Sequence, residues 1–343
     1  MPSHRFCSID PAWAAGYRGF FNWRTFSFLI ITFFVIVTAL FPGSYATADG
    51  EIVLRNDAVP LSSDLIVGRF GVGKLYFDDP SDLDTDEEEN VYILDSGNYR
   101  IQVMDEDGDF LKEWGGRGLD DGEFREPVAL SLDSDNEFVY ILDKERYLVQ
   151  KFDLDGNFIL SFGKRGIRKG RFDDPVDLTI DFQGYIYVLD RDRGAIIKFH
   201  SSGAFVDEWG DIGRKRDEFS DPVSLTFSDV RLGSIYVLDI GRKAILKFDR
   251  KGDYEETIPL LPEEIADGNP VKIRSDDSGN LFILESKQGK LLKLKGFTYS
   301  VFSLVSEKNR MGKPSGLTVD EEGRVYITDL AKNKIVRYRM ELE

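Results

Sequence analysis

The feature that most constrains this chain is a unit that repeats six times in register. A proline recurs at intervals of 44 to 48 residues, at Pro80, Pro127, Pro175, Pro222, Pro270 and Pro314. A second column keeps step with it, an aromatic residue followed three positions later by an acid, at Tyr92/Asp95, Tyr140/Asp143, Tyr187/Asp190, Tyr236/Asp239, Phe282/Glu285 and Tyr326/Asp329. Self-similarity at such a period indicates units that stack on one another to build a common core.

Each unit contains four strand-length runs. In the third unit they are residues 176–180, 185–189, 195–199 and 205–209, each apolar or alternating and each bounded by Gly, Asp, Ser or Asn. Proline cannot donate to a β-ladder, so it suits the first position of an inner strand. Four strands per unit and six units predict an all-β fold, a six-bladed β-propeller.

The two ends of the repeat region complement each other. The stretch 65–70 resembles the fourth strand of a unit, because Phe70-Gly71 matches Trp114-Gly115, whereas the last unit ends after its third strand, residues 334–340. We therefore expect the N-terminal strand to complete the last blade and close the ring, so that the propeller spans 65–343. Residues 49–64 form an N-terminal extension, of which 51–60 are either an extra strand or a tether.

The first 48 residues differ in composition from the rest. Three arginines precede an uncharged run of 16 residues, 26–41, and Ala46-Thr47-Ala48 follows as an A-x-A cleavage pattern. This pattern predicts a secretory signal peptide over 1–48, cleaved near Ala48, and a periplasmic or extracellular mature protein. The alternative is an uncleaved anchor, for which the run is short of the roughly 20 residues that a spanning helix needs.

Composition narrows the chemistry of the mature protein. The only cysteine, Cys7, leaves with the signal peptide, which excludes a disulfide or a thiolate nucleophile. The formal charge is −17, and the loss of three Arg and one Asp changes it to −19. Such an acidic chain repels nucleic acid. The charge is uneven along the chain, since residues 265–343 carry 14 basic and 11 acidic residues. This unevenness is either random variation on a solvated surface or a dipolar face that orients a partner.

The repeat resembles the NHL family of six-bladed propellers. The segments VYILDSGNYRIQVM at 91–104 and DGDFLKEWG at 107–115 match the family unit, a V-Y-V-x-D strand, an R-I-x-x-F segment and a G-x-F-x-x-x-W-G strand. The resemblance covers about 65–343 and implies the propeller fold. It leaves the function open, because NHL propellers include RNA-binding modules, extracellular sensors, protein-interaction platforms and amidating lyases.

Two of these functions conflict with the sequence. The lyases hold a catalytic zinc through histidines, whereas the mature chain has one histidine, His200, at a turn position held elsewhere by aspartate. The RNA-binding members need a positive face, which the acidic composition disfavours. We therefore predict no nucleic-acid partner and no catalytic residue of these types.

A calcium site in the channel is a further possibility. Residues just before and two after each recurrent proline should approach the channel mouth, and those with oxygen ligands are Asp79, Asp82, Glu126, Asp174, Asp177, Asp221 and Asn269. Of these we consider Asp82 and Asp177 as calcium ligands, although Lys272 and Lys313 would oppose a cation. The acidic run 82–89 is interpreted as a solvated hairpin tip.

The leading hypothesis is an exported, non-catalytic binding or scaffold module that needs no cofactor. Its recognition face would combine the links between blades with the loops that follow the recurrent acid. Beside the oxygen-bearing residues above, the predicted binding residues there are Lys313, Arg100, Arg146, Arg191 and Arg242. Mixed charge suits a protein or a polar polymer as partner, with membrane contact only through an uncleaved signal segment. The alternative is a calcium-dependent hydrolase, lactonase-like or lyase-like propeller enzyme.

Overall fold

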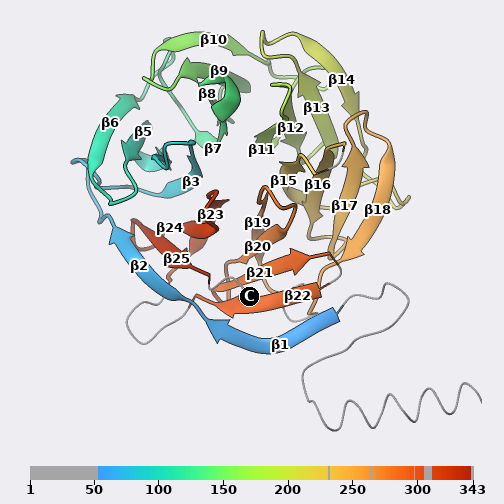
Figure 1. Cartoon of the computed structure of the whole chain (residues 1–343). Helices are drawn as coiled ribbons and strands as arrows, with labels where there is room; N and C mark the ends of the chain where they lie inside the picture. Colours follow the sequence, from blue (N-terminus) through green and yellow to red (C-terminus); the bar gives the residue numbers. More distant parts are fainter. Residues whose placement is uncertain are drawn as a thin grey trace, which may run out of the picture. The chain divides into compact units, whose positions relative to one another are not determined.

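A computed structural model shows a closed ring of six β-sheets around a central channel (Figure 1). The structure describes residues 53–340, except 231, 263, 264, 266, 297 and 305–310, and the side chains from residue 58 onward. The predicted signal peptide lies outside the described residues. Within the described part of the chain, no helix is long and apolar enough to cross a membrane.

The first three blades are meanders of four antiparallel strands. Blade one consists of β3 (Pro80–Thr85), β4 (Val91–Asp95), β5 (Arg100–Met104) and β6 (Phe110–Gly115). Blade two consists of β7 (Pro127–Asp133), β8 (Phe138–Asp143), β9 (Leu148–Asp153) and β10 (Phe158–Phe162). Blade three consists of β11 (Pro175–Ile180), β12 (Ile186–Asp190), β13 (Ala195–Phe199) and β14 (Phe205–Trp209).

The last three blades continue the pattern. Blade four consists of β15 (Pro222–Ser228), β16 (Ser234–Asp239), β17 (Ala244–Asp249) and β18 (Tyr254–Pro259). Blade five consists of β19 (Pro270–Ser275), β20 (Leu281–Glu285), β21 (Lys290–Lys295) and β22 (Thr298–Ser303), with β1 (Val53–Pro60) as a fifth strand. Blade six consists of β23 (Pro314–Val319), β24 (Arg324–Asp329), β25 (Lys334–Arg339) and β2 (Ser62–Val67). Every inner strand begins at its recurrent proline.

The N-terminal strand closes the ring, as the sequence predicts. β2 pairs antiparallel with β25, and Val67 lies opposite Ile335. The strand ends at Val67 rather than Phe70, because Gly68 adopts a positive φ of 107° and turns the chain away. Of the two alternatives for residues 51–60, the extra strand is correct for the described part, since β1 pairs in parallel with β22.

The meander gives the ring two distinct faces. Consecutive strands of a blade run antiparallel, so the hairpins between strands one and two and the turns between strands three and four lie at one end. The loops between strands two and three and the links to the next blade lie at the other end. We call these the hairpin face and the link face.

Large rings fill the wedge between neighbouring blades. Trp114, on the outer strand of blade one, lies 6.2 Å from Phe152 in blade two, measured between ring centroids. The turn glycine Gly156 of blade two packs on the same indole; a Cβ there would lie 2.5 Å from it, and its φ is +85°. This packing explains the repeated aromatic-glycine pair at the end of the outer strand.

The inner strands are sheet edges whose inward N–H groups lack a ladder partner. Side chains of the preceding blade supply acceptors for several of them. Asp82 accepts from Leu130 N at 3.1 Å, and the equivalent Asp177 accepts from Leu225 N at 3.1 Å. At several positions two and four after the proline, polar side chains therefore join neighbouring blades as well as lining the channel.

Candidate functional site

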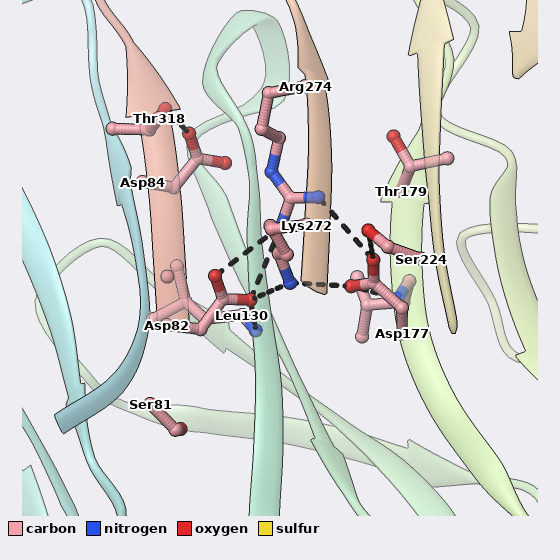
Figure 2. Close-up of polar contacts among 12 residues, drawn as sticks. Ser81, Asp82, Asp84, Leu130, Asp177, Thr179, Ser224, Lys272, Arg274 and Thr318 are labelled. Atoms are coloured by element: carbon pink, nitrogen blue, oxygen red, sulfur yellow. Dashed lines mark hydrogen bonds and ion pairs between the residues drawn. The ribbon is translucent and has the colours of Figure 1, made fainter. Parts of the chain in front are cut away.

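Four charged side chains meet in the middle of the channel. Lys272, from β19, places its Nζ 2.7 Å from Asp82 Oδ2 and 2.8 Å from Asp177 Oδ1. Figure 2 shows the lysine between the two aspartates. The three residues come from blades five, one and three, whose inner strands face one another across the ring. With Arg274 they form what we call the channel quartet.

Arg274 completes the quartet one layer closer to the hairpin face. Its guanidinium nitrogens lie 3.3 Å from Asp82 Oδ2 and 3.5 Å from Asp177 Oδ2. No member of the quartet is more than 9% exposed. Buried charges in such numbers are tolerated because each is paired and hydrogen-bonded, and removal of one member leaves an unpaired charge.

The electrostatics of Asp177 reflect this pairing. Burial alone would raise the pKa of its carboxyl, but the charges of Lys272 and Arg274 outweigh burial and hold the pKa below its usual value. The Ser224 hydroxyl also donates to Asp177 at 2.5 Å. Asp177 is therefore held as an anion whose acceptor sites are already used.

A cavity of about 340 Å³ lies above the quartet and opens on the hairpin face. We call it the hairpin mouth. All six hairpins between strands one and two contribute to its lining, which contains eleven acidic side chains and a single cation, Arg274. The acids outside the turn positions are Asp84, Glu87, Asp135, Asp229, Asp277 and Glu321.

The other five lining acids stand six positions after the recurrent prolines, at Asp86, Asp133, Asp181, Asp276 and Asp320. These are first of all turn residues. Asp181 shows the full pattern: its Oδ1 accepts from Gln183 N and Tyr185 N, and its Oδ2 accepts from the Tyr187 hydroxyl at 2.8 Å. An aspartate that bonds forward to the backbone stabilises a tight turn.

Asp133 departs from that pattern. It is 6% exposed and lines the hairpin mouth, yet its Oδ2 has no hydrogen-bond partner among the described residues. The Tyr140 hydroxyl, which would pair with it by analogy with Tyr187, is also buried without a partner in the described chain. The hairpin of blade two contains a 3-10 turn, Ser134–Asn136. Burial raises the pKa of Asp133.

Like charges at the rim of the mouth repel one another. Burial raises the pKa of Asp277, and the neighbouring carboxylates of Asp229 and Asp276 raise it further. Burial and then Asp277 and Glu87 likewise raise the pKa of Glu321. A positively charged ligand in the mouth would relieve this repulsion.

The acids of the mouth are spread out rather than clustered. In the part of the chain that the structure describes, no three His, Cys, Asp or Glu residues are placed to hold one metal ion together. The predicted calcium ligands Asp82 and Asp177 do lie close together, but the ammonium group of Lys272 already stands between them. Calcium at these two residues stays a prediction that requires the lysine to move.

The remaining predicted binding residues lie on the link face, away from the mouth. The residues before the prolines are tied to the recurrent acid of their own blade. Asp143, for example, accepts from Arg125 N and Glu126 N, and Asp190 accepts from Asp173 N and Asp174 N. The predicted residues placed in this way are Asp174, Glu126, Asp221, Asn269 and Lys313, whereas Asp79 N bonds to Asn333.

The predicted recognition arginines have a structural role on that face. Arg100 donates to the carbonyl oxygens of Val72 and Gly73, both at 3.0 Å, and Arg146 donates to Leu119 O at 2.9 Å. Arg242 donates likewise to the link carbonyls of residues 215 and 216. These arginines fasten the link that enters their blade. Arg191 instead pairs with Asp174 at 2.8 Å.

The sequence carries a signal for the hairpin mouth in a further column of the repeat. The position six after the recurrent proline is acidic in five of six repeats, and the following position adds Glu87, Asp229, Asp277 and Glu321. The acidic stretches 82–89, 133–137 and 320–323 predict solvated hairpin tips. In the structure, residues 82–85 of the first run belong to β3 and only its later part forms the hairpin tip, where Asp86 and Glu87 line the cavity.

Comparison with known proteins supports the propeller. A family described as 6-bladed beta-propeller (DUF5128) matches residues 78–162. No curated protein matches the sequence. The six-bladed fold is thus supported by both sequence and structure, whereas the NHL repeat remains a resemblance.

Solved structures of similar shape come from proteins of different function. A catalytically inactive virginiamycin B lyase from Staphylococcus aureus, solved with quinupristin, has a TM-score of 0.55 and 15% identity, covering 79% of this chain and 82% of the lyase. A gluconolactonase from Xanthomonas campestris has a TM-score of 0.54 and 17% identity, covering 83% and 98%. A protein of unknown function from Bacteroides thetaiotaomicron has a TM-score of 0.59 and 17% identity, covering 86% and 79%. Such low identity establishes the fold alone.

Proposed function

We propose that this protein is a non-catalytic binding module whose hairpin mouth receives a positively charged segment of a partner protein. The observation that carries this proposal is the charge of the cavity: eleven acidic side chains line it, and its one cation is already bound in the quartet. The proposal keeps the sequence-based expectation of a protein partner but moves the contact to the opposite face of the ring.

The spacing of the acids favours an extended ligand. Because the carboxylates come from all six hairpins, they suit several separated positive charges better than one ion. Lysine and arginine side chains of a peptide supply such charges on flexible stems. The unpartnered Oδ2 of Asp133 offers a buried acceptor for one of them, since a donor there would meet an oxygen that now lacks a hydrogen bond within the described chain.

The quartet argues against acid–base chemistry in the channel. A general base or a nucleophilic carboxylate must be able to exchange a proton or bond with a substrate. Asp82 and Asp177 instead each contact both Lys272 and Arg274, and both also accept a backbone N–H. Their environment suits structural support of the cavity floor.

A labelled peptide of alternating lysine and glycine tests the proposal by fluorescence anisotropy with the full chain. The triple variant Asp229→Asn, Asp277→Asn and Glu321→Gln removes three rim charges. Each exposed charge should contribute about 0.5 kcal/mol to the binding free energy, so the triple variant should bind about ten-fold more weakly. Asparagine and glutamine keep the shape of the side chains they replace, so the fold should be retained.

The matched control removes three acids from the link face, Asp120→Asn, Asp121→Asn and Asp217→Asn. Both triples change the net charge equally, so a non-specific effect of charge would weaken binding equally. Equal losses in the two triples, or no binding by the parent chain, would refute a basic ligand at the hairpin mouth.

The similar folds of the lyase and the gluconolactonase support a second candidate, a propeller enzyme. The test is turnover of gluconolactone and of virginiamycin B by the full chain, with and without added calcium. Turnover that requires calcium and disappears in Asp177→Asn would favour the enzyme. The one histidine of the described residues, His200, bonds to Ser202 in an exposed turn and does not line the cavity.

Export remains part of the proposal. Cleavage near Ala48 would place Asp49 at the new N-terminus of the mature protein. N-terminal sequencing of the protein recovered outside the cytoplasm decides between cleavage and an uncleaved anchor, because an anchored chain would keep residues 1–48.

A further inference from the structure

The link face carries a second candidate surface, at the links that enter blades one to four. All four links have the same fold. In each, a short parallel bridge joins the start of the link to the phenylalanine three before the proline, as between Arg117 and Phe124 or between Arg165 and Phe172. The chain between the bridged residues forms a turn that projects from the ring, closed for example by the bond from Arg171 N to Arg168 O.

The tips of three of these turns are exposed aliphatic residues at the same repeat position. Val72 is 77% exposed, Leu119 is 69% exposed and Ile167 is 76% exposed. The arginine fasteners hold two of the tips in place, since Arg100 binds Val72 O and Arg146 binds Leu119 O. Single exposed aliphatics are common on proteins, but repeated ones on fixed tips of one face mark an interaction site.

The third link adds a concentration of positive charge. Residues 163–171 read GKRGIRKGR, five cations around Ile167 with no acid, in a chain of net charge −17. Lys164, Arg165, Arg168 and Lys169 are exposed, and none forms an ion pair with a described residue. The next link also carries cations, Arg214-Lys215-Arg216, but Asp217 and Glu218 follow them and Lys215 pairs with Glu218. The positive charge is thus gathered at the link that enters blade three.

We propose that the link tip of blade three docks on an anionic lipid surface, with Ile167 entering the headgroup region and the surrounding cations binding phosphate. Charge complementarity supports an anionic partner. The aliphatic tips stand on separate blades rather than in one groove, and a plane can meet them together. Basic residues around exposed apolar ones are the composition of membrane-surface segments.

The arrangement also fixes an orientation. The hairpin mouth, with its acidic lining, lies at the opposite end of the ring and is repelled by the same surface. A propeller docked by its link face would therefore hold the mouth open to solution. The docking does not depend on the basic ligand proposed above, and it differs from the expectation that only an uncleaved signal segment contacts a membrane.

The experiment is co-sedimentation of the full chain with vesicles of equal parts phosphatidylglycerol and phosphatidylcholine, and with pure phosphatidylcholine vesicles. The full chain is used throughout, so any contribution of residues 1–48 is common to every sample. We expect stronger binding to the anionic vesicles, weakened by salt. Arg168→Gln with Lys169→Gln should lower that affinity about 25-fold, near five-fold for each cation.

Two further variants keep the test decisive. Lys251→Gln with Lys295→Gln removes the same charge from the hairpin face and should leave vesicle binding unchanged. Asp120→Arg with Asp121→Lys places after Leu119 the same two cations that follow Ile167 and should strengthen binding, so the proposal can be checked even if the loss variant is unstable.

Ile167→Ser separates apolar insertion from charge. It should weaken binding to anionic vesicles while leaving the salt dependence unchanged, because the cations remain. Equal binding to both vesicle types, or equal losses in the link-face and hairpin-face doubles, overturns the proposal. Binding of labelled polyglutamate but not of anionic vesicles also overturns it, and would identify an acidic protein segment as the occupant.

Discussion

The two faces of the ring use the same kinds of charged residue in opposite ways. On the link face, acids and arginines that recur in each repeat bind backbone groups, as Asp143 and Arg146 do, and so fasten the links. On the hairpin face, acids gather around a cavity whose single cation serves the quartet beneath. On the link face these charged side chains stabilise the propeller, whereas on the hairpin face the excess of carboxylates around the cavity can attract a positively charged ligand.

A second comparison is between residues that recur in every blade and residues that occur in one blade only. The quartet exists because blades one and three carry an aspartate and blade five a lysine where other blades have Ala129, Ser224 or Gly316. Among the acids at the hairpin mouth, Asp133 of blade two has a buried Oδ2 without a hydrogen-bond partner in the described chain, and the polybasic link occurs only before blade three. Beside the hairpin mouth, whose acids recur in most repeats, functional candidates therefore lie where one blade differs from the others.

The largest expected effect comes from the quartet. Lys272→Met should lower the free energy of unfolding by about 3–5 kcal/mol, because it leaves Asp82 and Asp177 buried with Arg274 as their only cation. Lys215→Met is the matched control on the link face, where Lys215 and Glu218 form an exposed pair. Urea unfolding of both variants measures the difference, and similar midpoints would show that the channel pair is not structural.

A smaller loss of stability should distinguish the arginines that bind link carbonyls from the cations of the exposed link tips. Arg146→Lys removes the forked contacts to Leu119 O and Glu123 O and should cost about 2 kcal/mol of stability, because charged hydrogen bonds to those carbonyls are lost. Arg168→Lys, on an exposed tip, keeps its charge and should leave stability unchanged. Thermal unfolding checks both; an unaffected Arg146→Lys would return Arg146 to the candidate recognition residues.

The sequence predicted the fold in detail because the repeat constrains it six times over. Proline columns located the inner strands, and the missing fourth strand after residue 340 located the closure. The predicted end of β2 is wrong because the Phe70-Gly71 pair matches the end of an outer strand, whereas Gly68, with its positive φ, ends the strand at Val67. Local turn chemistry decided the boundary, which an alignment of aromatic residues does not reveal.

The sites were less predictable for a different reason. The sequence shows that Asp82, Asp177 and Lys272 occupy equivalent repeat positions. It does not show that their side chains meet, because this contact depends on how blades one, three and five face one another across the channel. The arginines after the recurrent acid could be located but not distinguished as fasteners, since their partners are backbone carbonyls. Hydrogen bonds from a side chain to distant backbone carbonyls cannot be recognised from the residue types alone.

The ionised carboxyl of Asp133 at the hairpin mouth should lower the stability of the folded chain. Burial raises its pKa, so the folded chain holds the proton to higher pH than the unfolded chain, and the ionised carboxyl opposes folding at neutral pH. Asp133→Asn should therefore raise the unfolding free energy by about 1 kcal/mol at pH 7, and by less near pH 4. Unfolding at the two pH values measures this; a loss of stability would mean that the charged form is satisfied in the folded state.

The smallest effect concerns the hydroxyl that Asp133 fails to reach. Tyr140→Phe removes a buried hydroxyl without a partner among the described residues and should change stability by under about 0.5 kcal/mol, whereas Tyr187→Phe breaks the bond to Asp181 and should cost about 1 kcal/mol. Both tyrosines occupy the same column of the repeat, so the pair isolates hydrogen bonding from packing. Thermal unfolding of the two variants compares them directly. Equal losses would show that blade two pairs its tyrosine as blade three does, and the unpaired oxygen at the mouth would no longer distinguish the hairpin face.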